Sequence, residues 1–294
     1  MDFFTIKDLE NLSGIKAHTL RIWEQRYGFI KPERTQTNIR YYNNDELKKI
    51  LNISLLNKNG YKISHISAMS GAEISEAVLS LKDIPSKEQK LANVLLQKLI
   101  DLEISGFEKL LNASLLEAGV DRTMESVVFP LLSKIGTLWL TSHIRPAQEH
   151  IVSNMIRQKI LAATDQLPPA KAAAGTVLLF LPEGERHELG LLYMYYKLKK
   201  SHFNTIYLGA DVPLADVKEL VSKKKPAYIY IHLTGTAPYI DLHSFLKALS
   251  AVAKNALCVV TGDAVAAHSK KLPKNMVLQL SPAEVPAFLM QYGK

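Results

Sequence analysis

From residue 175 onward, short apolar runs alternate with stretches of helical character, and this alternation constrains the fold most strongly. The runs are residues 176–181, 205–208, 227–233, 257–261 and 277–280. Near-continuous apolar strands separated by helices are typical of a parallel sheet that is covered on both faces. The sequence therefore predicts a doubly wound α/β domain over residues 175–294.

The preceding segment, residues 86–166, has a helical period instead. Leu91, Leu95, Leu99 and Leu102 recur at spacings of three and four, as expected for one face of a helix. Two further helices are predicted over residues 124–139 and 146–164, the second with Pro146 in its first turn. This segment is expected to form a central four-helix bundle, joined to the α/β domain by the proline-rich residues 166–175.

The N-terminal segment, residues 1–75, has the pattern of a winged helix-turn-helix. Thr5 can cap a first helix, and Gly14 supplies a tight turn before a second helix over residues 16–25. The second helix would present a basic surface to the major groove of DNA. That surface consists of His18, Thr19, Arg21 and Arg26. A short hairpin carrying Arg34 and Arg40 is predicted to follow Pro32.

The positive net charge of the chain favours an anionic binding partner. The chain has 294 residues and a net charge of +8. Residues 1–70 hold eleven Lys or Arg against seven Asp or Glu, so a quarter of the chain carries half of the excess. No apolar run reaches the roughly 20 residues that span a bilayer, and the single cysteine, Cys258, excludes an internal disulfide. We expect a cytoplasmic protein without a membrane partner.

The N-terminal run resembles the mercury-resistance regulator (MerR) family. The likeness rests on residues 19–28, on Pro32 and Arg34, and on residues 38–42, 45–47 and 60–66. It implies that Arg21, Arg34, Arg40 and Tyr41 contact double-stranded DNA, and that the protein binds near-palindromic operators as a dimer. The alternative is a solvated basic surface with no role in DNA binding. For Trp23 and Tyr27 a core role is expected, since aromatic residues at helical spacing more often pack in a core than contact bases.

A second motif follows the first predicted strand of the α/β domain. Glu185-x-His187-x-x-Gly190 places a histidine at the carboxyl end of that strand, where doubly wound sheets bind ligands. One ring nitrogen of His187 can ligate a metal while the carboxylate of Glu185 holds the other. Gly190 would let the next helix approach closely. An ordinary surface loop histidine is the alternative.

Together with residues 207–213, this motif resembles the cobalamin-binding domain of B12-dependent methyltransferases and regulators, which is Rossmann-like. The resemblance implies that His187 is the lower axial ligand of cobalt in adenosylcobalamin or methylcobalamin. Trp139, Glu149 and His150 resemble the cap of light-sensing B12 regulators, which lies over the upper axial side. Thr234 and Gly262 match further positions of the cofactor site.

Three residues depart from the pattern of that family. His232 stands where a small Ser or Thr is usual, and its ring would crowd the nucleotide tail of the cofactor. Asp263 follows Gly262 where a second glycine is common, and it adds bulk and charge near the same tail. Leu140 follows Trp139 where photoreceptors carry a histidine, which argues against light sensing through two histidines.

Three functions are compatible with these features. The favoured one is a transcriptional regulator without enzymatic activity, a homodimer or tetramer whose DNA binding responds to a corrinoid. The second is a regulator whose corrin pocket has degenerated and which responds to a protein partner; His232 and Asp263 favour it. The third is a corrinoid methyl carrier, which leaves the helix-turn-helix unexplained.

Overall fold

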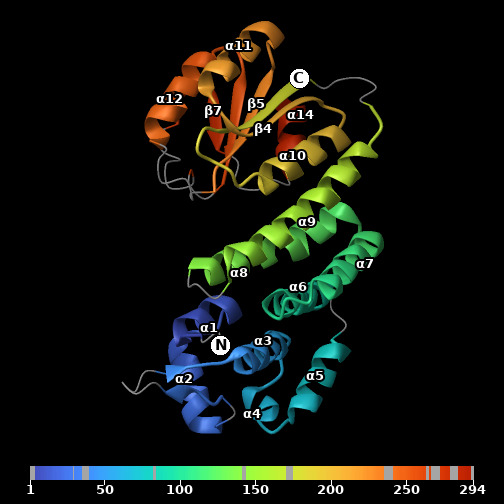
Figure 1. The fold of residues 1–294 in the computed structure, drawn as a ribbon, viewed down its shortest axis with the longest axis vertical. Helices are drawn as coiled ribbons and strands as arrows, with labels where there is room; N and C mark the ends of the chain where they lie inside the picture. The colour runs from blue at the N-terminus through green and yellow to red at the C-terminus, as the bar shows by residue number, and fades with distance from the viewer. Residues whose placement is uncertain are drawn as a thin grey trace. The chain divides into compact units, whose positions relative to one another are not determined.

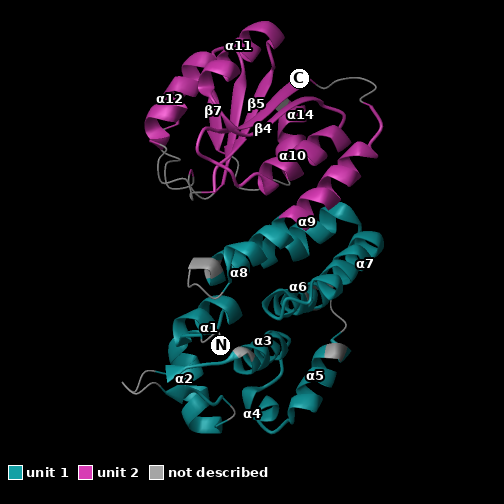
Figure 2. Cartoon of the chain, viewed as in Figure 1, with its two compact units in different colours: residues 1–153 teal, residues 154–294 magenta. Residues whose placement is uncertain are grey.

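In the computed structural model, the described residues are 4–28, 30–34, 40–81, 84–140, 144–169, 175–234, 241–262, 265, 272–278 and 284–292. The chain divides into two compact units, Met1–Ser153 and Asn154–Lys294 (Figure 2). The boundary falls inside helix α9 (Pro146–Asp165). The finer division into domains over residues 1–75, 86–166 and 175–294 stays a prediction.

The first unit begins with the predicted helix-turn-helix. Helix α1 (Ile6–Ser13) is capped by Thr5, whose hydroxyl accepts from the backbone N–H of Asp8 at 3.3 Å. The Asp8 carboxylate accepts in return from the Thr5 N–H at 2.8 Å, which completes a capping box. Gly14 ends the helix with φ 74°, and α2 (Ala17–Tyr27) follows, beginning one residue and ending two residues later than predicted. The predicted cap and turn are therefore confirmed.

A small hairpin and three helices complete the N-terminal part of this unit. Strands β1 (Glu33–Arg34) and β2 (Arg40–Tyr41) pair antiparallel, as predicted, and residues 35–39 between them lie outside the described residues. The helices that follow are α3 (Asn44–Lys58), α4 (Ile63–Ile66) and α5 (Gly71–Ser80). Phe4 and Tyr42 form an antiparallel β-bridge that joins the N-terminus to the end of the hairpin, and both side chains are fully buried.

The helical segment contains α6 (Ile84–Ile100), α7 (Ile104–Thr123), α8 (Phe129–Leu140) and the start of α9 (Figure 1). The prediction of one continuous helix over residues 124–139 was wrong in detail, because Met124–Val128 form a π-helical turn. Pro130 explains the difference: it has no N–H to donate to the carbonyl four residues earlier, and its ring would clash with that carbonyl. The Phe129 N–H bonds the Met124 carbonyl instead. Every helix in the described part of the chain is too short or too polar to span a bilayer.

The second unit is built on a five-stranded, fully parallel sheet in the order β4-β3-β5-β6-β7. Its strands are β3 (Thr176–Pro182), β4 (Asn204–Val212), β5 (Tyr228–His232), β6 (Leu257–Thr261) and β7 (Met276–Leu278). All five were predicted from the sequence, with β4 several residues longer than expected. The fold class is thus the predicted doubly wound sheet.

Alternate residues of the central strands supply two separate cores, one on each face of the sheet. Leu178, Phe180 and Ile229 pack with α11 (Leu214–Lys224) and α12 (Leu242–Val252). Val177, Leu179 and Leu181 pack with α10 (Leu189–Lys200) and α14 (Val285–Tyr292) on the opposite face (Figure 1). Burial on both faces explains why these strands are continuously apolar.

The strand order fixes where a ligand site can form. From β3 the chain crosses to β4 on one side, and it then returns to β5 on the other side of β3. The crevice outside the carboxyl ends of β3 and β5 is therefore the topological switch point, where such sheets bind ligands. The loop after β3 contains Glu185 and His187, and Thr234 lies just after β5.

Candidate functional site

Three side chains from the segments that follow β3 and β5 meet at the switch point. Oε1 of Glu185 lies 2.8 Å from Nδ1 of His187 and also accepts from the His187 backbone N–H at 2.9 Å. Oε2 of Glu185 accepts from the Thr234 hydroxyl at 3.1 Å. Glu185 is only 1% exposed, whereas the His187 side chain is 58% exposed. The predicted pairing of Glu185 with His187 is confirmed, and Thr234 extends it to a row of three hydrogen-bonded side chains.

The carboxylate of Glu185 is held in its charged form. Burial by itself raises its pKa, but hydrogen bonds from the His187 ring and backbone and from Thr234 outweigh burial and lower the pKa to about 2. An ionised carboxylate accepts hydrogen bonds only, so it holds the proton of His187 on Nδ1. Nε2 is then the nitrogen that can ligate a metal, and its ring is oriented and made more basic by Glu185.

The loop that carries His187 is anchored by the end of β4. The Asp211 carboxylate accepts from the Gly184 N–H at 2.8 Å and pairs with Arg186 at 3.3 Å. The Asp211 N–H donates to the Glu185 carbonyl at 3.2 Å, and Asp211 itself has φ 61°. The hydrogen bond from Gly184 lowers the pKa of Asp211, with Arg186 adding to the effect. Sequence reasoning gave Asp211 no role of its own, although it belongs to the run 207–213 that carried the resemblance.

Beside this loop, the ring of His232 fills the space against the start of α10. A Cβ placed on Gly190 would lie 2.5 Å from Cδ2 of His232, so any larger residue there would require the His232 ring to move. Nδ1 of His232 lies 2.8 Å from the Thr261 hydroxyl, which also lies 2.7 Å from the Tyr230 hydroxyl. The predicted close approach at Gly190 is confirmed, and the group approached is the His232 ring.

Gly262 is held against the backbone of the neighbouring strand end. Its φ is 101°, and a Cβ there would lie 2.1 Å from the Leu233 carbonyl oxygen. Gly262 therefore has a packing role independent of any ligand, and its contact with a cofactor stays a prediction. Asp263 lies outside the described residues.

The predicted cap residues lie in the first unit. Trp139 and Leu140 end α8, and their side chains lie outside what the structure describes. Glu149 and His150 stand in the first turns of α9, where Oε2 of Glu149 lies 3.0 Å from Nδ1 of His150. The His150 side chain is 71% exposed, so its ring is accessible to a ligand.

The predicted DNA contacts lie on α2 and the hairpin of the same unit. Arg21 and Arg26 are exposed on α2, Thr19 is half-buried, and Arg34 is exposed on β1. Trp23 is 8% exposed, which confirms the expectation that it serves the core.

Two of the predicted contacts already have intramolecular partners. Nε of Arg40 lies 3.0 Å from Oε1 of Glu24, and the Tyr41 hydroxyl donates to Glu33 at 2.9 Å. Arg40 has four further N–H donors, so this pairing orients its guanidinium and leaves other donors for a second partner. Ile22, beside Arg21 on α2, is 51% exposed, and sequence reasoning gave it no role.

Residues 4–72 match the MerR HTH family regulatory protein domain, and residues 91–163 match the B12 binding domain. The HTH-type transcriptional repressor CarA of Myxococcus xanthus is 29% identical over 75% of this chain and 73% of CarA. The HTH-type transcriptional repressor CarH of the same organism is 24% identical over 96% of this chain and 95% of CarH.

Among solved structures, the monomethylamine corrinoid protein of Methanosarcina barkeri aligns with a TM-score of 0.58 and 18% identity. The alignment covers 70% of this chain and 99% of that protein, and it shows a shared fold. The chain therefore combines a MerR-type helix-turn-helix domain with a B12-binding domain, and it is homologous to the CarA and CarH transcriptional repressors.

Proposed function

We propose that this protein is a DNA-binding transcriptional regulator whose affinity for its operator is controlled by a corrinoid. Corrinoid binding would change the conformation or the oligomeric state of the protein. The effector must then bind the DNA-competent and DNA-incompetent states with different free energies. The binding partners proposed for the protein are a double-stranded DNA operator and a second copy of the chain.

The observation that carries the proposal is the hydrogen-bonded chain Thr234–Glu185–His187 at the switch point of the sheet. A buried carboxylate that orients an exposed histidine is the arrangement that metal-ligating histidines use. His187 is the residue we assign as the lower axial ligand of cobalt. Among the described residues, no group of three or more His, Cys, Asp or Glu could hold a bare metal ion. A cofactor that brings its own remaining ligands fits a site with one histidine.

The other predicted cofactor residues complete this assignment. Trp139, Glu149 and His150 are the further residues of the first unit that we propose for corrinoid binding, and Gly190, Thr234 and Gly262 are those of the second unit. The bound corrinoid would supply a cobalt centre that can exchange a ligand. The residues of this chain would hold His187 in one orientation and keep its proton on Nδ1.

The direct test is retention of the cofactor by the purified protein. The protein is mixed in the dark with adenosylcobalamin or methylcobalamin, free cofactor is removed, and the visible spectrum and molecular mass are recorded. We expect retained cofactor with a histidine-ligated spectrum and a change in molecular mass or hydrodynamic radius. A folded protein that retains neither cobalamin would overturn the proposal.

Arg21→Ala is expected to weaken DNA binding, because Arg21 is exposed on the helix assigned to the major groove. The loss should be about 1–3 kcal/mol if Arg21 contacts a base, or a fall of about one in the salt slope if it contacts phosphate. The probe is a duplex selected by the protein from a random-sequence pool. Lys218→Ala, which removes an exposed charge from α11, is the matched control. Equal losses in both variants would remove Arg21 from the interface.

His232→Ser is expected to tighten binding of complete cobalamin by about tenfold, or about 1.4 kcal/mol. The serine would open the space that the ring fills against Gly190, where we propose that the nucleotide tail enters. Binding of cobinamide, which lacks that tail, should not change. If both corrinoids respond equally, the ring does not restrict the tail.

The filled space beside Gly190 also supports a second candidate function. In that case the corrin pocket has degenerated, and a protein partner controls DNA binding. The two candidates differ in the cofactor test, since a degenerate pocket retains neither cobalamin, even in the His232→Ser variant.

A further inference from the structure

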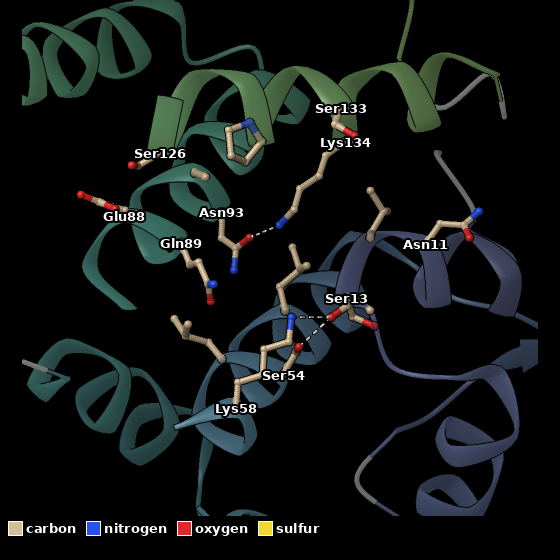
Figure 3. Close-up of a pocket in the computed structure, with 16 residues that line it drawn as sticks. Asn11, Ser13, Ser54, Lys58, Glu88, Gln89, Asn93, Ser126, Ser133 and Lys134 are labelled. Carbon is tan, nitrogen blue, oxygen red and sulfur yellow. Dashed lines mark hydrogen bonds between the residues drawn. The ribbon is translucent and has the colours of Figure 1, made fainter. Parts of the chain in front are cut away.

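A cavity lined by both polar and apolar side chains lies within the first unit, apart from the corrinoid site proposed above. It has a volume of about 460 Å³ and lies between α1 and α3 of the helix-turn-helix part and α6, the π-helical turn and α8 of the helical segment (Figure 3). This volume lies within the range of small-molecule sites. Its walls therefore join the DNA-binding part to the segment that matches the B12 binding domain.

Two lysine amines enter this cavity from opposite walls. Nζ of Lys134, on α8, donates to Oδ1 of Asn93 at 2.5 Å, and Nζ of Lys58, on α3, donates to the Ser13 carbonyl at 3.4 Å. Figure 3 shows both side chains reaching toward the middle of the cavity. An ammonium group has three donors and no acceptor, so each amine has donors left after its single hydrogen bond.

The charge of the cavity wall is unbalanced. Among the described residues, Glu88 is the one acidic residue that lines it, and its Oε1 already accepts from Nε of Arg122 at 2.5 Å. Within the described ranges, no ion pair joins Lys58 or Lys134 to a carboxylate. Burial lowers the pKa of Lys134 to about 8, and the charge of Lys58 adds to this effect. A negative charge between the two amines would offset both the burial of the Lys134 ammonium and its repulsion by Lys58.

Neutral hydrogen-bond donors surround the two amines. Asn93 is 7% exposed, and its amide nitrogen remains available because its oxygen accepts from Lys134. Gln89 and Ser126 line the same cavity. Amide and hydroxyl donors beside two cations suit a ligand with several oxygen acceptors.

We propose that this cavity binds a small oxyanion, a metabolite bearing a carboxylate or phosphate group, between Lys58 and Lys134. Because the two lysines belong to α3 and α8, the anion would tie the DNA-binding part to the helical segment. The cavity is thus a second effector site, which acts on DNA binding without the corrinoid. It does not depend on His187.

The test uses the full-length protein without cobalamin. Inorganic phosphate and succinate are titrated by calorimetry at low salt up to about 10 mM, a range that detects millimolar dissociation constants. The ammonium of Lys134 is followed by NMR of carbon-13-labelled lysine. We expect saturable binding of at least one anion and a rise in the pKa of Lys134 on binding.

Variants separate this site from general attraction of anions. Lys134→Gln and Lys58→Gln should each weaken binding at least tenfold, whereas Lys109→Gln, an exposed lysine on α7, should not. Lys134→Gln removes a half-buried cation whose pKa is lowered by burial, so we expect its melting temperature to equal or exceed that of the wild type. Absence of binding by both anions would overturn the proposal, and so would equal effects of all three variants. Binding only of phosphate or only of succinate would identify the group that the site takes.

Discussion

His187→Ala is expected to lower the affinity for adenosylcobalamin by at least about 100-fold. Loss of groups that merely orient a metal ligand costs about 10–100-fold, so loss of the ligand itself should match or exceed the upper end. The fold should survive, because the His187 side chain is 58% exposed and substitutions at exposed positions change stability little. Equilibrium binding in the dark, read from the visible spectrum, measures the effect.

His243→Ala is the matched control, since it removes an exposed histidine on α12 of the same unit. It should bind cobalamin like the wild type. Glu185→Gln should fall between the two, because it keeps the shape of the side chain but removes the charge that orients His187. Unchanged affinity in His187→Ala would show that this histidine is not the ligand.

Gly262→Ala is expected to destabilise the second unit by about 3 kcal/mol or more. Its φ of 101° strains any residue with a side chain, and the added Cβ would lie 2.1 Å from the Leu233 carbonyl oxygen. Backbone strain and overpacking each cost about 1–3 kcal/mol. The free energy of unfolding from urea titration, followed by circular dichroism, measures the loss.

Gly209→Ala separates strain from steric overlap. Gly209 has φ 83°, yet a Cβ there meets only ordinary contacts at 3.8 Å, in the same unit. It should therefore lose only the strain component, about 1–3 kcal/mol. If both variants lose the same free energy, the contact with Leu233 relaxes without cost, and Gly262 has no packing role.

Local patterns were enough to predict the elements of the fold. The cap at Thr5, the turn at Gly14 and the strand over 257–261 depend on nearby residues, and the structure has them as predicted. The π-helical turn at Met124–Val128 was missed, although Pro130 is visible in the sequence. A proline at that point is also compatible with the first turn of a new helix. The choice between a new helix and a π-helical turn depends on packing against the surrounding helices, which the sequence does not specify locally.

The candidate site was predictable where its members are neighbours in sequence. Glu185 and His187 are two residues apart, so their pairing followed from the motif. The hydrogen bond from Thr234 and the anchoring by Asp211 join residues 49 and 27 positions apart, and no local pattern specifies them. The pairing of Arg40 with Glu24 was missed for the same reason.

The measurement that tests the central claim most directly is the affinity for a selected DNA duplex with and without adenosylcobalamin, in the dark. Wild type and His187→Ala are compared at one salt concentration, because affinity for DNA depends steeply on salt. Coupling between two sites usually amounts to about 5–150-fold, so we expect cobalamin to change the wild-type affinity at least about fivefold and to leave His187→Ala unchanged. An affinity that cobalamin does not alter, in wild type that retains the cofactor, would contradict corrinoid control of DNA binding.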